Sequence, residues 1–254
     1  MNRVRGSNAR RSLKERIARG VRRRLARSWT ELPGEIIGDD FAAWIQKLAA
    51  ESSTRTMVEI GAGTGDGSTR AFVAGAETQT DPPVLFSIEA SPTRAEELRT
   101  RYAHKPFVHT CEAASAPPDA YMSEVEAIEW HYVLHGDRNA AESVAYKRDL
   151  ELRNLKEWGV PTNAVEQIRA THGITHFDVA LLDGSGFTGT HDLSCVYGAR
   201  WLLLDDIWTP KNHGNCVSLL GDSNYELVAT EANVRNGYAV FRWVGDGPPT
   251  PMPE

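Results

Sequence analysis

Thr56-Met-Val-Glu-Ile-Gly-Ala-Gly-Thr-Gly-Asp-Gly-Ser68 is the stretch that decides the fold of this 254-residue chain. Its apolar residues Met57, Val58 and Ile60 predict a buried parallel strand, and glycines then occupy alternate positions from 61 to 67. A helical pattern follows from residue 69. Because glycines let the backbone turn sharply and approach a ligand closely, the stretch predicts the opening of a nucleotide-binding βαβ unit.

The spacing of acids and glycines distinguishes between nucleotide ligands. A dinucleotide fingerprint, G-x-G-x-x-G, requires a third glycine at the position of Asp66, whereas the chain reads Glu59-x-Gly61-x-Gly63-x-Gly65. A second predicted strand, 83–88, ends at Glu89. That acid lies 24 residues past Gly65, close to the roughly 20-residue spacing of a ribose-binding carboxylate. Its alternative role is to cap the helix that follows.

This pattern resembles motif I of the class I S-adenosylmethionine (SAM) methyltransferases. The resemblance implies a Rossmann-like three-layer αβα sandwich, whose seven-stranded sheet is mostly parallel with an antiparallel last strand. It also implies that SAM is the cofactor, with its methionine moiety near Glu59 and its adenine near the turn at 112–115. The residues that the resemblance assigns to SAM are Glu59, Gly61, Ala62, Gly63, Gly65, Glu89, Ala90, Ala114, Ser115 and Asp183.

Acids also end two later predicted strands. Phe177-Asp-Val-Ala-Leu-Leu-Asp183 and Arg200-Trp-Leu-Leu-Leu-Asp205-Asp206 are apolar runs of the kind found in buried strands. If the strands are neighbours, Asp183, Asp205 and Asp206 meet at one edge of the sheet, where α/β proteins bind ligands. Their mutual repulsion would shift their pKa values, and a Mg²⁺ ion, which prefers oxygen ligands, would remove that penalty. The alternative to metal binding is that these three acids cap helices and form turns after the strands.

The three acids resemble those of catechol and macrocin O-methyltransferases, in which a metal holds substrate oxygens and lowers the pKa of a hydroxyl. The resemblance covers about residues 56–243. It departs at Gly186, where the catechol enzymes have lysine, and at 197–199, where Gly-Gly is usual. The sequence motifs are more similar to those of an uncharacterised bacterial methyltransferase-like group associated with polysaccharide or glycan genes. The similar stretches are 181–189, 204–207, 211–212 and 235–241.

The resemblance implies methyl transfer to an oxygen of a sugar or another polyhydroxylated small molecule. Asp183 is then a catalytic residue, and His191, Lys211 and His213 are candidates for the base or a substrate contact. Each of these three is alternatively an ordinary surface residue. A metal-independent methyltransferase, a non-catalytic SAM-binding protein and an NAD-dependent enzyme stay open, although Asp66 disfavours the last.

Composition divides the chain into three parts. Residues 1–30 form a basic N-terminal arm, 31–246 the methyltransferase domain with a helical insertion at about 117–173, and 247–254 a flexible, proline-rich tail. Residues 1–28 carry a net charge of +10, so the remainder carries −16 of the total of −6. An acidic body argues against specific nucleic-acid binding.

Within the arm, apolar residues recur at every fourth position from Leu13 to Leu25. This period predicts a basic amphipathic helix able to lie on an anionic membrane surface. A solvated arm and a mitochondrial transit peptide are the alternatives. No apolar run reaches the roughly 18 residues of a membrane span, and three cysteines without C-x-x-C spacing indicate a reducing compartment. We therefore expect a cytoplasmic protein, and leave both peripheral contact with a membrane surface and homo-oligomerisation open.

Overall fold

The computed structural model describes residues 36–137 and 140–246. The predicted basic arm and its membrane contact, and the predicted tail, lie outside the described residues. No helix in these two stretches has the length and apolar character needed to cross a membrane.

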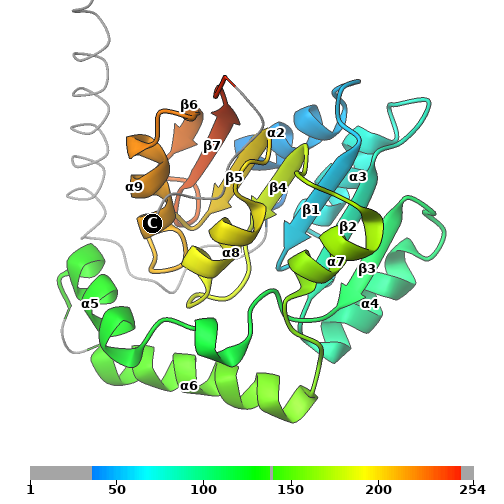
Figure 1. The fold of residues 1–254 in the computed structure, drawn as a ribbon. Coiled ribbons are helices and arrows are strands. Elements are labelled where there is room, and N and C mark those ends of the chain that lie inside the picture. The colour runs from blue at the N-terminus through cyan, green and yellow to red at the C-terminus, as the bar shows by residue number, and fades with distance from the viewer. Residues whose placement is uncertain (1–35, 138–139, 247–254) are drawn as a thin grey trace, which may run out of the picture.

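Seven strands form one sheet in the order β3-β2-β1-β4-β5-β7-β6, as Figure 1 shows. β7 is antiparallel to both of its neighbours, and the other pairs are parallel. The predicted Rossmann-like sheet, mostly parallel with an antiparallel last strand, is therefore confirmed. The strands are β1 (Thr56–Ile60), β2 (Val84–Glu89), β3 (Val108–Glu112), β4 (Val179–Leu182), β5 (Trp201–Asp205), β6 (Tyr225–Glu231) and β7 (Tyr238–Trp243). The chain order reverses between β1 and β4, which is where open α/β sheets bind ligands.

Helices cover both faces of the sheet because successive strand residues point to opposite sides. In β1, Val58 belongs to the core beneath α7 (Ala164–His172), α8 (Gly189–Val196) and α9 (His213–Gly221). Its neighbour Met57 belongs to the core beneath α2 (Asp40–Ala49), α3 (Ser68–Ala76) and α4 (Pro92–Tyr102). Successive residues of β1 thus pack against the helices on opposite faces of the sheet.

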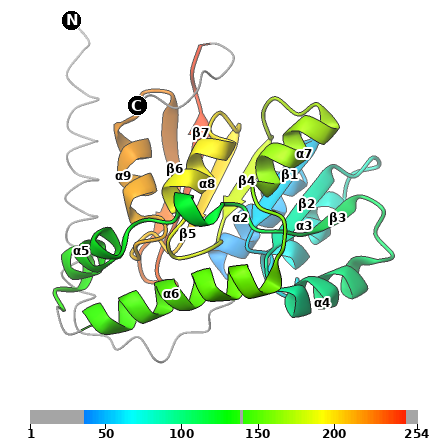
Figure 2. The same cartoon turned by 60° about the horizontal axis from the view of Figure 1, so that its bottom comes forward.

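The segment predicted as a helical insertion contains η1 (Pro118–Ala120), α5 (Glu124–His135), α6 (Ala141–Trp158) and then α7. Figures 1 and 2 show α5 and α6 lying across the end of the sheet toward which β1 points. A small apolar cluster joins Ala127 of α5, Val144 of α6 and Phe187 of the loop after β4. These two helices therefore form a wall beside the carboxyl ends of the strands.

The connection between the last two strands is longer than a two-residue hairpin turn. Residues 232–237 separate β6 from β7. Within this longer connection, Arg235 and Gly237 both adopt positive φ angles, 48° and 78°. The extra residues allow the Arg235 side chain to turn inward, where it is only 6% exposed.

Candidate functional site

The glycine loop brings β1 close to the ends of β2 and β4. Gly61 has φ +88°, and a Cβ atom there would lie 2.3 Å from the carbonyl oxygen of Asp183. Any side chain would therefore push the loop away from β4. Gly63 has φ +59° with open space around its Cβ position, and its N–H donates to Glu89 Oε2 at 2.9 Å.

Beside this loop lies a first cavity of about 400 Å³. Its volume is within the range of roughly 300–1,000 Å³ that small-molecule ligands occupy. The predicted cofactor residues on its wall are Gly61, Gly63, Glu89, Ala90, Ala114, Ser115 and Asp183. Polar and apolar groups both contribute, and the glycines leave room for close approach. These residues fit a nucleoside ligand such as SAM.

Three predicted cofactor residues do not line this cavity: Glu59, Ala62 and Gly65. Gly65 packs against α4, and its carbonyl accepts a hydrogen bond from the Tyr102 hydroxyl at 2.6 Å. A Cβ atom on Gly65 would come within 2.6 Å of the same ring. The absence of a side chain at Gly65 therefore lets the glycine loop pack closely against α4.

Glu59 is fully buried on the α3 side of the sheet. Its carboxylate accepts hydrogen bonds from the hydroxyls of Ser68, Thr69 and Ser87, the last two at 2.7 and 3.0 Å. Burial nevertheless raises the pKa of Glu59 to about 7. The side chain joins β1 to the start of α3 and supports the loop from behind.

Glu89 faces the first cavity and is 4% exposed. Besides the Gly63 amide, it accepts from the Ser91 N–H at 2.8 Å and pairs with Arg94 at 3.0 Å. The predicted capping alternative is thus partly realised, since Ser91 precedes α4. A carboxylate offers about four lone-pair sites, so these three partners leave capacity for a ligand hydroxyl.

The acids at the ends of β4 and β5 come together as expected. One oxygen from each of Asp183, Asp205 and Asp206 lies within 4.8 Å of the others. The Lys211 ammonium lies among them, 2.7 Å from Asp183 Oδ1 and 2.9 Å from Asp206 Oδ2. Burial alone would lower the pKa of Lys211, but the acids raise it above its ordinary value. This lysine is therefore a fixed positive charge and not a base.

The third acid has a cation of its own. Asp205, 2% exposed, accepts from Arg235 Nη2 at 2.6 Å, and Arg235 also pairs with Asp39. With Lys211 and Arg235 in these positions, the acids already have cationic partners. A Mg²⁺ ion held by all three acids would have to displace the Lys211 ammonium, so this arrangement does not fit the predicted Mg²⁺ site.

A second cavity of about 670 Å³ lies against α5 and α6. Lys211 and Asp206 line it, while their partner Asp183 lines the first cavity. Glu151 of α6 belongs to both walls, and its carboxylate accepts a hydrogen bond from the Ser185 hydroxyl. The cluster of Asp183, Lys211 and Asp206 therefore stands between two ligand-sized spaces.

The other two base candidates lie elsewhere. The imidazole of His191 contacts Cys195 and Glu166, on the α7 and α8 side of the sheet, and lines neither cavity. His213 begins α9, and its Nδ1 lies 3.0 Å from the carbonyl of Ile207. Burial lowers the pKa of His213.

Several residues of the site were not predicted from the sequence. Arg94, Tyr121, Glu151 and Trp158 line the first cavity, and Arg235 holds Asp205. Only Arg94 had a usable signal, because it follows Glu89 at the start of the next predicted helix. The others reach the site through the tertiary fold: Tyr121 follows η1, Glu151 and Trp158 belong to α6, and Arg235 lies in the connection between β6 and β7.

No model of a known protein family matches the chain, and no curated protein matches its sequence. Solved structures share the fold. A protein from Corynebacterium glutamicum is 11% identical with a TM-score of 0.50, over 91% of this chain and 90% of that one. An O-methyltransferase from Bacillus cereus, in complex with SAH, is 12% identical with a TM-score of 0.49, over 92% and 91%. TomG, an O-methyltransferase from Streptomyces achromogenes in complex with SAM, is 15% identical with a TM-score of 0.45, over 80% and 79%.

Proposed function

We propose that this protein is a SAM-dependent methyltransferase that acts on a hydroxyl group of a small, polyhydroxylated acceptor such as a sugar. One observation carries the proposal: two cavities adjoin at the carboxyl ends of β4 and β5, with Asp183, Lys211 and Asp206 between them. A group-transfer enzyme needs such a pair of spaces, because donor and acceptor must meet in a fixed geometry.

In this proposal the first cavity holds SAM, whose sulfonium carries the transferable methyl group. Gly61 and Gly63 leave room for it, and Glu89 accepts hydrogen bonds from the ribose. Ala114 and Ser115 lie where the resemblance puts the adenine. Asp183 closes the end of the cavity that faces the acceptor.

The acceptor would occupy the second cavity. Ser143, Lys147, Asn236 and Lys211 supply polar groups to its wall, and Val144, Leu150 and Phe187 supply apolar surface. A mixed wall of this kind suits a ring that carries several hydroxyls on apolar carbons. The polar groups support a sugar or related acceptor over a purely apolar one.

An alcohol is a weak nucleophile at neutral pH and needs to lose its proton as the new bond forms. We assign the proton to the Asp206 carboxylate, which lines the acceptor cavity. The Lys211 ammonium would stabilise the negative charge that develops on the acceptor oxygen. Because Lys211 supplies this charge, the proposal follows the metal-independent alternative and takes no step through Mg²⁺.

Calorimetry with SAM, SAH and NAD tests the cofactor. We expect SAM and SAH to bind with micromolar dissociation constants, about −8 kcal/mol, and NAD to bind far more weakly. Gly63→Val should abolish SAH binding, since its side chain enters the cavity. Gly173→Val is the matched control, because Gly173 also has a positive φ, +64°, and open Cβ space, but ends α7 away from the cavity.

Methyl transfer from labelled SAM to a panel of sugars and other polyols tests the reaction. Transfer that disappears in Asp206→Asn, with unchanged SAH affinity, would support the assignment. Binding of SAH with no transfer to any hydroxyl compound would leave a SAM-binding protein. Tight NAD binding without a SAM signal would overturn the proposal.

A further inference from the structure

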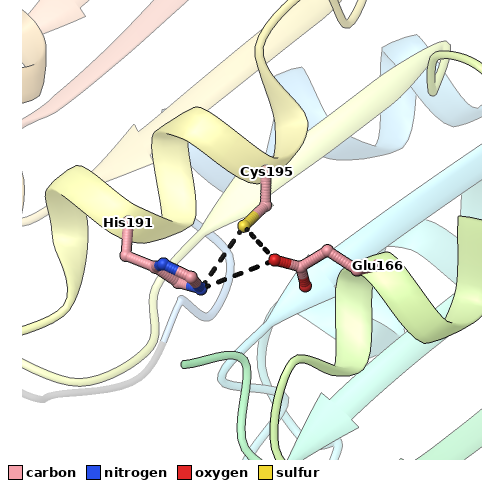
Figure 3. Close-up of side chains that lie close together, drawn as sticks. All are labelled: Glu166, His191 and Cys195. Carbon is pink, nitrogen blue, oxygen red and sulfur yellow. Dashed lines mark hydrogen bonds and ion pairs between the residues drawn. The ribbon is translucent and has the colours of Figure 1, made fainter. Parts of the chain in front are cut away.

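A second group of potential metal ligands lies outside the site described above. Glu166 of α7 and His191 and Cys195 of α8 turn their side chains toward one another, as Figure 3 shows. Cys195 Sγ lies 3.0 Å from Glu166 Oε1 and 3.4 Å from His191 Nε2, and the last two atoms are 3.7 Å apart. Both α8 ligands lie on one side of the helix because they are four residues apart.

The distances suit one small ion. Zinc binds cysteine sulfur at about 2.3 Å and histidine nitrogen or carboxylate oxygen at about 2.0–2.2 Å. In a tetrahedral site, sulfur then lies roughly 3.5–3.7 Å from a nitrogen or oxygen ligand, and nitrogen lies roughly 3.3–3.5 Å from oxygen. The sulfur–nitrogen separation is 3.4 Å, the nitrogen–oxygen separation 3.7 Å and the sulfur–oxygen separation 3.0 Å. A movement of the Glu166 carboxylate by roughly half an ångström would bring the three ligands to their bonding distances.

The ligand types define the class of ion. A thiolate and an imidazole favour zinc and similar transition metals over Mg²⁺ or Ca²⁺, which prefer oxygen. From the geometry we infer that Glu166, His191 and Cys195 form a binding site for a zinc-class divalent cation, with water as the fourth ligand. Binding replaces the thiol proton of Cys195 by the metal, and that proton passes to the solvent.

Burial is consistent with this assignment. Cys195 is 7% exposed, whereas the side chains of His191 and Glu166 are 21% and 44% exposed. The sulfur is therefore shielded while the carboxylate side stays open to an entering ion and a bound water. The Cys195 thiol donates to Glu166, which places these two atoms within reach of one ion.

The bound ion would join α7 to α8, behind the wall of the first cavity. Ala164, at the start of α7, donates its N–H to the carbonyl of Ala114 at 3.2 Å, and Ala114 lines that cavity. Because a metal that binds only the folded chain stabilises it, the ion would raise the midpoint of thermal unfolding. This role does not depend on the reaction proposed above.

The test is titration of the full-length, metal-free protein with Co²⁺, a spectroscopic substitute for zinc. We expect one equivalent to produce a thiolate-to-cobalt charge-transfer band, which zinc then removes by displacement. Cys195→Ser should abolish the band, and His191→Ala and Glu166→Gln should weaken binding at least 10-fold. Cys111→Ser is the matched control, because Cys111 is a free cysteine outside the cluster.

Two results would overturn the inference: no charge-transfer band at micromolar Co²⁺, or a band that persists in Cys195→Ser. Asp183→Asn is a second control and should leave the band intact, because Asp183 lies outside the cluster. Glu166→Gln keeps the test valid if Cys195→Ser fails to fold, since this exposed side chain can change with little effect on the core.

Discussion

Lys211 Nζ lies 2.7 Å from Asp183 Oδ1, at the junction of the two cavities. The ammonium is only 12% exposed and also contacts Asp206 at 2.9 Å. One buried cation therefore holds together acids from the ends of two neighbouring strands. The sequence places Lys211 six residues past Asp205, in the loop that leads to α9.

We expect Lys211→Met to lower the free energy of unfolding by on the order of 3 kcal/mol, because it leaves poorly hydrated carboxylates without their cation. Urea unfolding at neutral pH measures this. Lys156→Met, on an exposed position of α6, is the control and should change little. A Lys211→Met protein as stable as the unmutated one would show that the pair contributes nothing to stability.

Addition of Mg²⁺ tests whether Lys211 or a metal ion is the cation that partners the three acids. In zinc-free buffer, millimolar Mg²⁺ should leave the thermal midpoint of the unmutated protein unchanged. It should raise that of Lys211→Met, because removal of the ammonium frees carboxylate oxygens for the ion. If Mg²⁺ instead raises the thermal midpoint of the unmutated protein, and this rise disappears in Asp183→Asn, the result would support the Mg²⁺ site predicted from the sequence.

We expect Glu89→Gln to weaken SAH binding 10- to 100-fold, about 1.5–3 kcal/mol, since a charged acceptor is lost from the cavity. The amide oxygen can still accept from Gly63, so the loop should keep its shape. Calorimetry measures the change, with Glu96→Gln as the control, because Glu96 is 65% exposed on α4. Unchanged affinity would assign Glu89 to capping alone.

Arg235→Gln should destabilise the protein by about 3–5 kcal/mol, because Asp205 would remain buried without its partner. Asp205→Asn in the same chain should recover part of that loss. Arg242→Gln is the control: this β7 arginine pairs with Glu226 on the surface, with side chains 49% and 53% exposed, and such pairs contribute about 0–1 kcal/mol. Equal effects of the two variants would contradict the role of Arg235.

Local patterns predicted the elements well. The second strand, predicted at 83–88, is β2, and the acids expected at the ends of β4 and β5 do meet. These predictions needed only apolar periodicity, glycine spacing and the rule that parallel strands end at one edge.

Side-chain partners were harder to predict. Glu59 lies between Val58 and Ile60, so the strand alternation sends it to the α3 side, yet the motif resemblance placed it near the cofactor. Arg235 is 30 residues from Asp205, and nothing local links them. His191 and Cys195 are four residues apart, a spacing that suits one side of a helix, but Glu166 comes from α7 and no local pattern links it to them.

The last prediction concerns Glu59 and pH. Burial raises its pKa from 4.5 to about 7, so the folded protein binds this proton more tightly than the unfolded chain. The resulting contribution to stability is fully present below pH 4.5 and is lost as the pH rises through 7. By linkage this contribution amounts to about 3 kcal/mol.

The Glu59→Gln variant lacks the titrating group, so the stability of the variant relative to the unmutated protein should rise between pH 5 and pH 8. Denaturant unfolding across that range measures the difference, with Glu157→Gln, at an exposed position of α6, as the control. A difference that stays constant with pH would show that Glu59 is charged throughout, held by the hydroxyls of Ser68, Thr69 and Ser87.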